Sequence, residues 1–186
     1  NVDRHGRFYA GTIDDEEKEA SGAFYRLNHQ LICARVDDGY RVTNGPAFSP
    51  DGKLMYANDS ALQVTYVFHV APDGTPLAKR EFARFGEGQG FPDGMTVDAE
   101  GCLWIAFWDG WCLRRLSPEG EIIAEVKMPV ARPTSCAFGG ASLDRLYVTS
   151  ASIGLSEDEL RMQPNAGGLF MLSPGVQGIA ERPFAG

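Results

Sequence analysis

The sequence predicts an all-β fold, a β-propeller built of four-stranded antiparallel blades. Short apolar runs alternate with turns rich in glycine, proline and aspartate, and the 3.6-residue period of a helical repeat is absent. One motif also recurs along the chain, in which an apolar residue is followed by a glycine in a turn and then by a second strand. Gly6 and Gly52 are 46 residues apart, Gly52 and Gly101 are 49 apart, and Trp104 and Tyr147 are 43 apart. A repeat of roughly 40 to 50 residues made of short strands is typical of propeller blades.

The individual elements follow from this repeat in chain order. We expect four stretches that each contain, in order, the end of an inner strand, a turn and a second strand. They are 1–12, 48–57, 97–106 and 138–149. Hairpins of outer strands are expected at 23–27 with 30–35, at 64–70 with 77–85 and at 111–116 with 122–126, and the last outer strands at 168–172 and 178–184. The one predicted helix spans Ser156–Met162, because Ser156 is a favourable N-cap and acidic residues fill the first turn.

Residues 1–186 are expected to form a single domain, since the composition is that of an ordinary soluble protein, 44% hydrophobic and 23% charged. Four units account for the whole chain, whereas a closed propeller of this type usually has more blades. The chain is therefore either a compact four-blade ring or part of a larger one. In the second case its open edges would favour self-association.

The charge and the apolar runs narrow the classes of partner and location. With 17 basic and 25 acidic residues the net charge is −8, which disfavours nucleic acids and anionic membranes as partners. No apolar run approaches the roughly 18 residues of a membrane span, and no signal peptide is visible. We expect a cytoplasmic protein, although Asn1 enters the repeat in mid-pattern and a signal peptide could precede it.

Cysteine, histidine and serine residues offer weaker hypotheses. The four cysteines, Cys33, Cys102, Cys112 and Cys136, form no C-x-x-C pair, so we expect reduced, buried thiols. The three histidines lack the spacing of a zinc site, and no nucleophile elbow surrounds Ser135.

The repeat gives Asp93 a special position. Pro92-Asp93-Gly94 is one of four Pro-acid-Gly tripeptides, which are ordinary turn sequences. In the alignment of repeats, however, Asp93 matches Asn44, and both precede a glycine at the start of an inner strand. Thr134 holds this position in the last unit, and in the first unit it falls before the chain begins. Because inner strands line the channel of a propeller, Asn44, Asp93 and Thr134 are expected to form a ring at one mouth.

A carboxylate and an amide oxygen that converge without a basic partner predict a site for a hard cation, calcium or magnesium. These two side chains cannot fill six to eight calcium positions, so water, substrate and a further carboxylate are also expected. The alternative is that Asn44 and Asp93 are turn residues selected for their backbone conformations.

Motifs along nearly the full chain resemble the regucalcin (senescence marker protein), gluconolactonase and luciferin-regenerating-enzyme-like family. They are Val2-Asp3 through Gly6 to Thr12, Asn44-Gly45 with Phe48-Ser49 and Asp51, Pro92-Asp93-Gly94-Met95 through Gly101 to Ala106, Thr134-Ser135-Cys136 through Gly139-Gly140 to Thr149, and Gly175-Val176 with Gly178. The resemblance implies a six-bladed propeller that hydrolyses sugar lactones with one divalent cation, calcium first and zinc, magnesium or manganese as alternatives. It also implies that this chain corresponds to the C-terminal two thirds of a family member.

The same resemblance assigns roles to particular residues. Asn44 and Asp93 match the metal-binding residues of the family, and Asp93 also matches the catalytic one. A substrate-contacting glutamate matches Glu16, with an uncertainty of one position within 14–17. The third metal ligand of the family, and its arginine and asparagine substrate contacts, match positions before residue 1.

Two functions from different classes remain open. In the first, the cation polarises the lactone carbonyl while Asp93 orients or deprotonates the attacking water, and Thr134 and Trp108 contact the substrate. Trp108 and Trp111 flank Asp109-Gly110 and are wall residues in this interpretation, and the loop around Asp158 is a lid. In the second, the protein is a calcium-binding or ligand-binding module without turnover.

Overall fold

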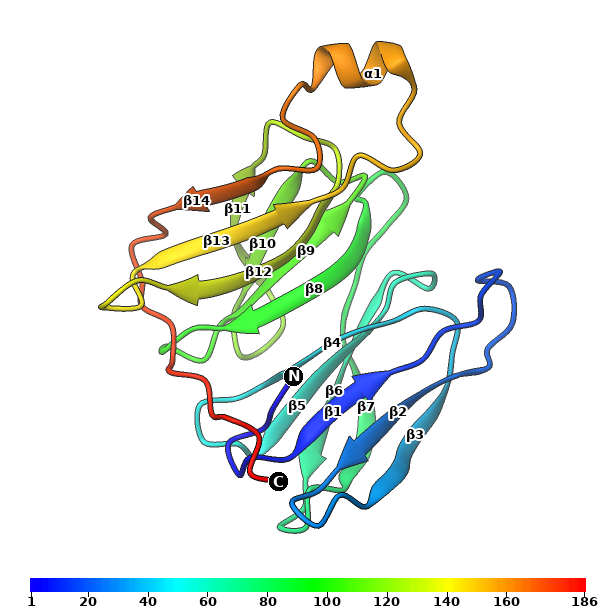
Figure 1. Ribbon diagram of the computed structural model, residues 1–186, viewed down its shortest axis with the longest axis vertical. Helices are drawn as coiled ribbons and strands as arrows, with labels where there is room; N and C mark the ends of the chain where they lie inside the picture. Colours follow the sequence, from blue (N-terminus) through cyan, green and yellow to red (C-terminus); the bar gives the residue numbers. More distant parts are fainter. The chain divides into compact units, whose positions relative to one another are not determined.

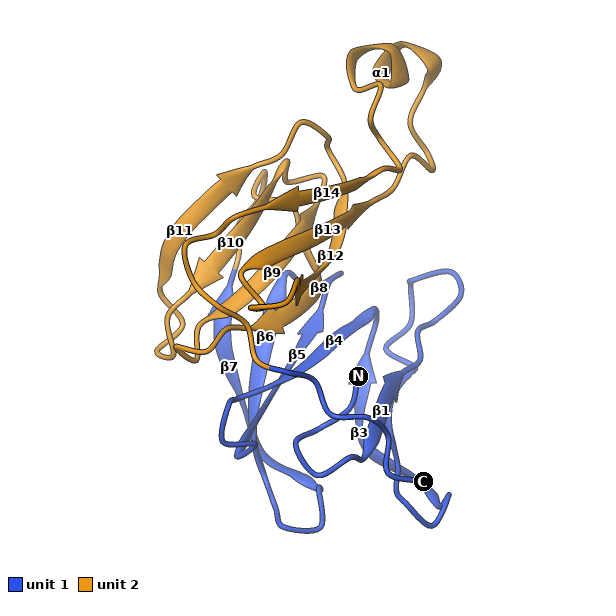
Figure 2. Ribbon diagram, turned by 60° about the vertical axis from the view of Figure 1, so that its left-hand side comes forward, with its two compact units in different colours: residues 1–84, 180–186 blue, residues 85–179 orange.

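The computed structural model describes all 186 residues and divides into two compact units (Figure 2). Unit 1 comprises Asn1–Arg84 with Ala180–Gly186, and unit 2 comprises Phe85–Ile179. Each unit contains two antiparallel sheets whose strands follow one another as meanders (Figure 1). The predicted all-β class is therefore confirmed, and four sheets are present as expected from four repeats.

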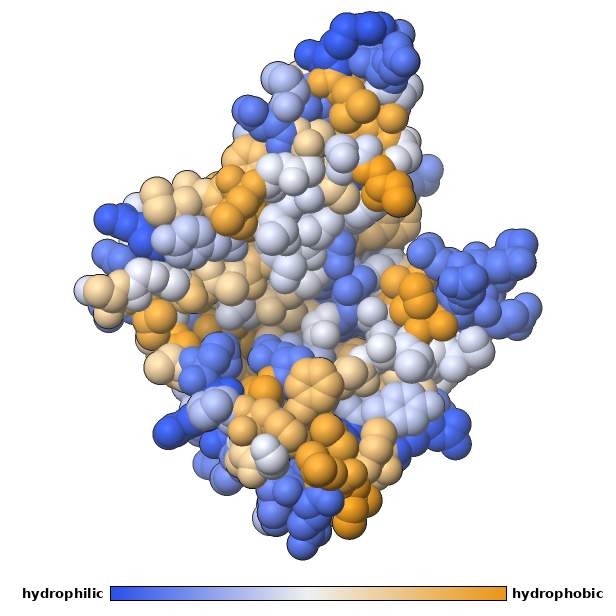
Figure 3. Space-filling view, in the orientation of Figure 1, coloured by the Kyte–Doolittle hydropathy of each residue, from blue (hydrophilic) through white to orange (hydrophobic).

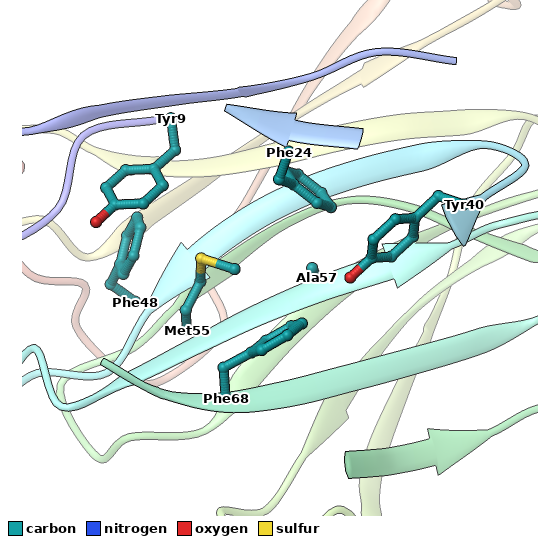
Figure 4. Packing of buried hydrophobic residues seen from close by; sticks show 7 residues of the cluster. All are labelled: Tyr9, Phe24, Tyr40, Phe48, Met55, Ala57 and Phe68. Carbon is teal, nitrogen blue, oxygen red and sulfur yellow. The ribbon is translucent and has the colours of Figure 1, made fainter. Parts of the chain in front are cut away.

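Unit 1 holds a three-stranded sheet in the order β1-β2-β3 and a four-stranded sheet in the order β4-β5-β6-β7. The strands are β1 (Phe8–Gly11), β2 (Gly22–Leu27), β3 (Cys33–Tyr40), β4 (Thr43–Phe48), β5 (Leu54–Asp59), β6 (Val64–Val70) and β7 (Pro76–Arg84). Alternate residues of both sheets meet in one core, which Figure 4 shows, formed by Tyr9, Phe24, Tyr40, Phe48, Met55, Ala57 and Phe68. Edge-on aromatic pairs such as Phe24 with Tyr40, at 5.1 Å between centroids, fill this core.

Unit 2 holds a four-stranded sheet in the order β11-β10-β9-β8 and a three-stranded sheet in the order β12-β13-β14. The elements are β8 (Phe91–Val97), β9 (Leu103–Trp108), β10 (Cys112–Leu116), β11 (Ile122–Lys127), β12 (Pro133–Gly139), β13 (Arg145–Ser150), α1 (Glu157–Met162) and β14 (Leu169–Leu172). Both sheets contribute to a second core, in which Trp104, Leu113 and Val148 are buried. Trp104 is thus a core residue.

Most predicted elements are confirmed within a residue or two. Val64–Val70 is β6 as predicted, and Ser156 caps α1 through a capping box with Glu159. The helix α1 is too short and too polar to be a membrane-spanning segment.

Three expectations are wrong. Residues 178–184 form no strand beyond a single bridge between Asp98 and Gly178, so the last sheet has three strands. The first sheet also has three strands, with a Val2–Phe8 bridge where an inner strand would end. All four cysteines are free, but Cys33 is exposed because it begins β3 at the sheet edge after the turn at 28–32.

The four Pro-acid-Gly tripeptides do not share one structure. Gly52, Gly74 and Gly120 have φ of 69°, 90° and 95°, the left-handed conformation of a turn glycine. Gly94 is not among the residues with positive φ, and Pro92-Asp93-Gly94 lies within β8. Proline is tolerated there because β8 is the edge strand of its sheet. Asp93 therefore sits in a strand rather than in a turn.

Candidate functional site

β4, β8 and β12, each the first strand of its sheet, are irregular at the same position in the repeat. The pairing register shifts between Asn44 and Ala47 in β4 and between Pro92 and Met95 in β8. In β12 it shifts beside Thr134, between Pro133 and Ser135. Such irregularities re-aim side chains and are common next to functional sites. The phase that the sequence assigns to Asn44, Asp93 and Thr134 thus coincides with a recurrent structural feature.

Within unit 2, the irregular ends of β8 and β12 lie against each other. A Cβ atom at Gly94 would stand 2.8 Å from the carbonyl oxygen of Thr134 and 2.3 Å from the Oγ of Ser135. Only glycine permits this approach, because real Cβ atoms do not come so close to other atoms. Asp93 and the backbone of Thr134 are therefore close neighbours, while the Thr134 Oγ1 lies 2.8 Å from the Oγ1 of Thr149.

Asp93 has the electrostatic character of a functional carboxylate. Burial raises the pKa of the Asp93 carboxyl to about 7, and a hydrogen bond from the Gly94 backbone N–H acts in the opposite direction. Burial dominates because removing a carboxylate from water disfavours its charged form. A carboxyl group with this pKa exchanges protons near neutral pH and gains from a nearby cation.

Asn44 lies in unit 1, at the second position of β4, and is half-buried. Its Nδ2 donates to the Oγ of Ser60 at 2.9 Å. This hydrogen bond leaves the carbonyl oxygen as the end of the amide that can bind a cation.

Glu16 lies in the loop between β1 and β2 of unit 1 and is exposed. It forms an ion pair with Lys18 at 2.6 Å, with both side chains more than 70% accessible. Asp14 instead organises the loop, since its Oδ2 accepts hydrogen bonds from the backbone N–H groups of Lys18 and Glu19, and these lower the pKa of Asp14. Four acidic residues at 14–17 are candidates for the substrate contact. Of these, Asp14 already accepts the hydrogen bonds that hold the loop together.

Trp108 ends β9 and is half-buried, at the same edge of unit 2 as Asp93, because Phe91 pairs with Trp108 in the ladder. The guanidinium carbon of Arg132 lies 4.8 Å from the Trp108 ring, and the Arg132 Nε donates to Asp109 Oδ1 at 2.6 Å. Sequence reasoning missed Arg132 as part of this edge, since nothing in its local sequence marks it. Trp111 is 47% exposed on the same turn.

The side chains of Asp93 and Asn44 carry oxygen atoms of the kind that bind a hard cation, but two side chains are few for such a site. A carboxylate at Asp93 and an amide oxygen at Asn44 are ligands that calcium accepts. No group of three or more His, Cys, Asp or Glu side chains in the chain is arranged to hold a metal ion. Further ligands would have to come from backbone carbonyls, water, substrate or another polypeptide segment.

The chain is similar to proteins known as lactonases and regucalcins. The family model described as SMP-30/Gluconolactonase/LRE-like region matches residues 1–152. The chain is 39% identical over 188 residues to 6-deoxy-6-sulfogluconolactonase of Pseudomonas putida, which covers 100% of this chain and 64% of that protein. It is 40% identical over 187 residues to L-arabinolactonase of Azospirillum brasilense, which covers 99% of this chain and 62% of that protein.

Among solved structures, a regucalcin from Agrobacterium tumefaciens strain C58, described as a calcium-binding protein, matches with a TM-score of 0.94 at 27% identity. The match covers 99% of this chain and 63% of that one. The chain thus spans slightly less than two thirds of the length of the relatives it matches.

Proposed function

Because this chain belongs to the SMP-30/gluconolactonase/LRE-like family, we propose that it serves in the hydrolysis of sugar lactones. The family match confirms the resemblance drawn from the sequence motifs. The observation that carries the proposal is the position of Asp93, a largely buried carboxyl group at an irregular strand end beside Thr134. A carboxyl group in such a position can bind a cation and orient an attacking water molecule.

In this proposal, the four sheets act as four blades of a six-bladed propeller, and the chain corresponds to its C-terminal two thirds. The 40-to-50-residue repeat and the four antiparallel meanders support this architecture.

The proposed reaction is the attack of water on the lactone carbonyl, followed by cleavage of the ring C–O bond to give a hydroxy acid. Asp93 holds the attacking water and takes its proton, which then passes to the leaving ring oxygen. Thr134 and Trp108 contact the sugar, the first through its hydroxyl or backbone and the second through its ring face, and Glu16 is a further substrate contact. These roles follow from the repeat phase, from the edge that Asp93, Thr134 and Trp108 share, and from the family resemblance.

We also propose one divalent cation, calcium first, with Asn44 and Asp93 among its ligands. When bound, it would polarise the lactone carbonyl and lower the pKa of a coordinated water. The same cation would lower the pKa of Asp93, so proton uptake by this carboxylate would be weaker than in the metal-free protein.

The proposal is tested by following acid release from gluconolactone with calcium-loaded protein, after subtracting the uncatalysed rate. Asp93→Asn is expected to abolish the catalysed release, and Asn44→Ala to weaken calcium binding in calorimetry. Asp51→Asn is the matched control, because Asp51 occupies the same Pro-Asp-Gly sequence in an exposed turn. Catalysed release that persists in Asp93→Asn would exclude the proposed role of this residue.

The second candidate function is calcium binding without turnover. It is favoured by the similarity to a regucalcin described as a calcium-binding protein, together with the partial span of the chain. Calcium binding that depends on Asp93, with no acid release from any of several aldonolactones, would support it over hydrolysis.

A further inference from the structure

The connection between β13 and β14, residues 151–168, is a long excursion that carries α1. It leaves the sheet at the edge of unit 2 that bears the proposed site, because Ser150 at the end of β13 pairs with Pro133 at the start of β12. It returns at Leu169, which pairs with Thr149. The excursion therefore begins and ends within one or two residues of the Thr134–Thr149 pair. Figure 1 shows it extending from the ends of β13 and β14 with α1 at its tip.

Little apolar packing holds this excursion in place. No residue of α1 is buried, and Ile153 and Met162 are each 75% exposed. Figure 3 shows hydrophilic surface over α1 with hydrophobic surface next to it. An excursion with so few buried contacts depends on a small number of polar anchors for its position.

Apart from the Ser150 hydroxyl, which donates to the Gly168 carbonyl at 2.9 Å, these anchors converge on Ala131 and Arg132, directly before β12. The Oε1 of Gln163, a buried side chain, accepts a hydrogen bond from the Ala131 N–H at 2.7 Å. The backbone N–H of Ala151 donates to the Arg132 carbonyl at 2.9 Å. The Arg132 guanidinium donates to the carbonyl oxygen of Ile153.

The Arg132 guanidinium also contacts the turn that contains Trp108 and Asp109. Its Nε donates to Asp109 at 2.6 Å, and its carbon lies 4.8 Å from the Trp108 ring. The Arg132 side chain is only 16% accessible, so these contacts are partly shielded from solvent. A planar guanidinium with several donors can join two segments in this way, whereas a lysine ammonium lacks the fixed fork.

We infer that Arg132 is a positioning residue of the proposed site, which fastens the excursion 151–168 to the Trp108–Asp109 turn and thereby sets the affinity for the lactone. This inference rests on the proposed function for its effect on substrate. The fastening itself is independent of that function. Arg132 does not touch the reacting atoms, so its loss acts on KM rather than on kcat.

Limited proteolysis tests the fastening directly. Arg161 is the one trypsin site within 151–168, and Arg132 itself is protected from trypsin by the following Pro133. Arg132→Ala is expected to speed cleavage after Arg161 about tenfold, because a charge-assisted anchor no longer opposes local opening. Arg145→Ala is the matched control at the other end of β13, where Arg145 donates to Ser173. It should leave that rate within about twofold.

Two further variants and a kinetic measurement complete the test. Asp109→Asn keeps the side-chain shape but removes the ion pair, and is expected to speed cleavage about threefold. Arg132→Lys should recover only part of the protection. In the lactonase assay, Arg132→Ala should raise KM several-fold with kcat within about twofold.

Cleavage after Arg161 that is no faster in Arg132→Ala than in Arg145→Ala would overturn the inference. A fall in kcat at constant KM would overturn its effect on substrate affinity. If the wild-type chain releases no acid from lactones, the proposed function fails, and the proteolysis series still decides whether Arg132 fastens the excursion.

Discussion

Replacing Asp93 by asparagine is expected to remove a pH dependence from the stability of the metal-free protein. The pKa of Asp93 is raised from 3.8 to about 7 in the folded chain, because its carboxyl group is withdrawn from water. As the pH rises through this interval, the unfolded chain loses the Asp93 proton before the folded chain does. Folding therefore becomes less favourable between pH 4 and 7, and the penalty is complete above pH 7.

The size of the effect follows from the two pKa values. Their difference corresponds to about 4 kcal/mol at most over the whole interval. Between pH 5 and pH 8 the same linkage relation gives a loss of roughly 2.5 kcal/mol in the free energy of unfolding. A neutral asparagine of similar shape does not titrate, so the stability of Asp93→Asn should lack this loss.

The assay is urea unfolding in the presence of a chelator at several pH values from 4 to 8, with wild type, Asp93→Asn and Asp51→Asn. Asp51 is the control of opposite sign, since hydrogen bonds from the Ser49 hydroxyl and the Lys53 backbone N–H lower its pKa. Its contribution to stability is complete above pH 4 and disappears only below that range, so the stability difference between wild type and Asp51→Asn should stay constant from pH 4 to 8. A constant stability difference between wild type and Asp93→Asn from pH 4 to 8 would refute the reasoning.

Three further substitutions test the framework around the site. Asp98→Ala should lower the free energy of unfolding by about 3 to 5 kcal/mol in urea titrations, because the buried Asp98 carboxylate accepts from the Cys102 N–H, the Trp104 Nε1 and Arg115, and its removal leaves buried donors without an acceptor. Gly94→Ala should cost about 1 to 3 kcal/mol and lower the thermal midpoint, because the new Cβ meets the Thr134 carbonyl. Ser156→Ala should cost about 1 kcal/mol of α1 stability, seen as faster amide exchange in α1 with an unchanged global midpoint.

The first two of these substitutions have matched controls. Asp144→Ala removes a carboxylate that pairs with Arg145 only at 3.9 Å near the surface, and should cost less than about 1 kcal/mol. Gly86→Ala adds a Cβ that meets no heavy atom within 4 Å, so it should leave the midpoint nearly unchanged. Equal effects of Gly94→Ala and Gly86→Ala would contradict the close approach of β8 and β12.

Much of the fold could be predicted because local chemistry and the repeat agree. Val64–Val70 alternates in the way that a strand requires, and Ser156 with Glu159 forms the capping box that starts α1. The segment 178–184 was mispredicted because an apolar run becomes an outer strand only if a partner edge is available. From Ala180 the chain belongs to unit 1, where the Ala180 carbonyl accepts from Arg4, so it cannot continue along β14.

Only part of the candidate site could be predicted from the sequence. The phase of Asn44, Asp93 and Thr134 could be read from spacing alone, since a register shift at one phase recurs when a supersecondary unit is repeated. Arg132 could not be found in this way. Its partners Asp109 and Ile153 lie 23 and 21 residues away, and they meet only because the two turns share one edge of unit 2.

Asp51 and Asp93 both lie in Pro-Asp-Gly tripeptides, but their carboxyl groups have different environments. The position of the tripeptide in the repeat therefore determines the properties of the carboxyl group more than the tripeptide sequence does. In a Pro-Asp-Gly turn the carboxylate stays in water and accepts nearby N–H donors, as at Asp51, so its charge is already stabilised and a cation adds little. When the same tripeptide falls within β8, the Gly94 N–H still donates to the carboxyl group, but this group is largely withdrawn from water. The charged form of Asp93 is therefore less favourable than that of Asp51. A carboxylate in that state suits metal binding and proton transfer, and the strand environment that creates it lies outside the tripeptide itself.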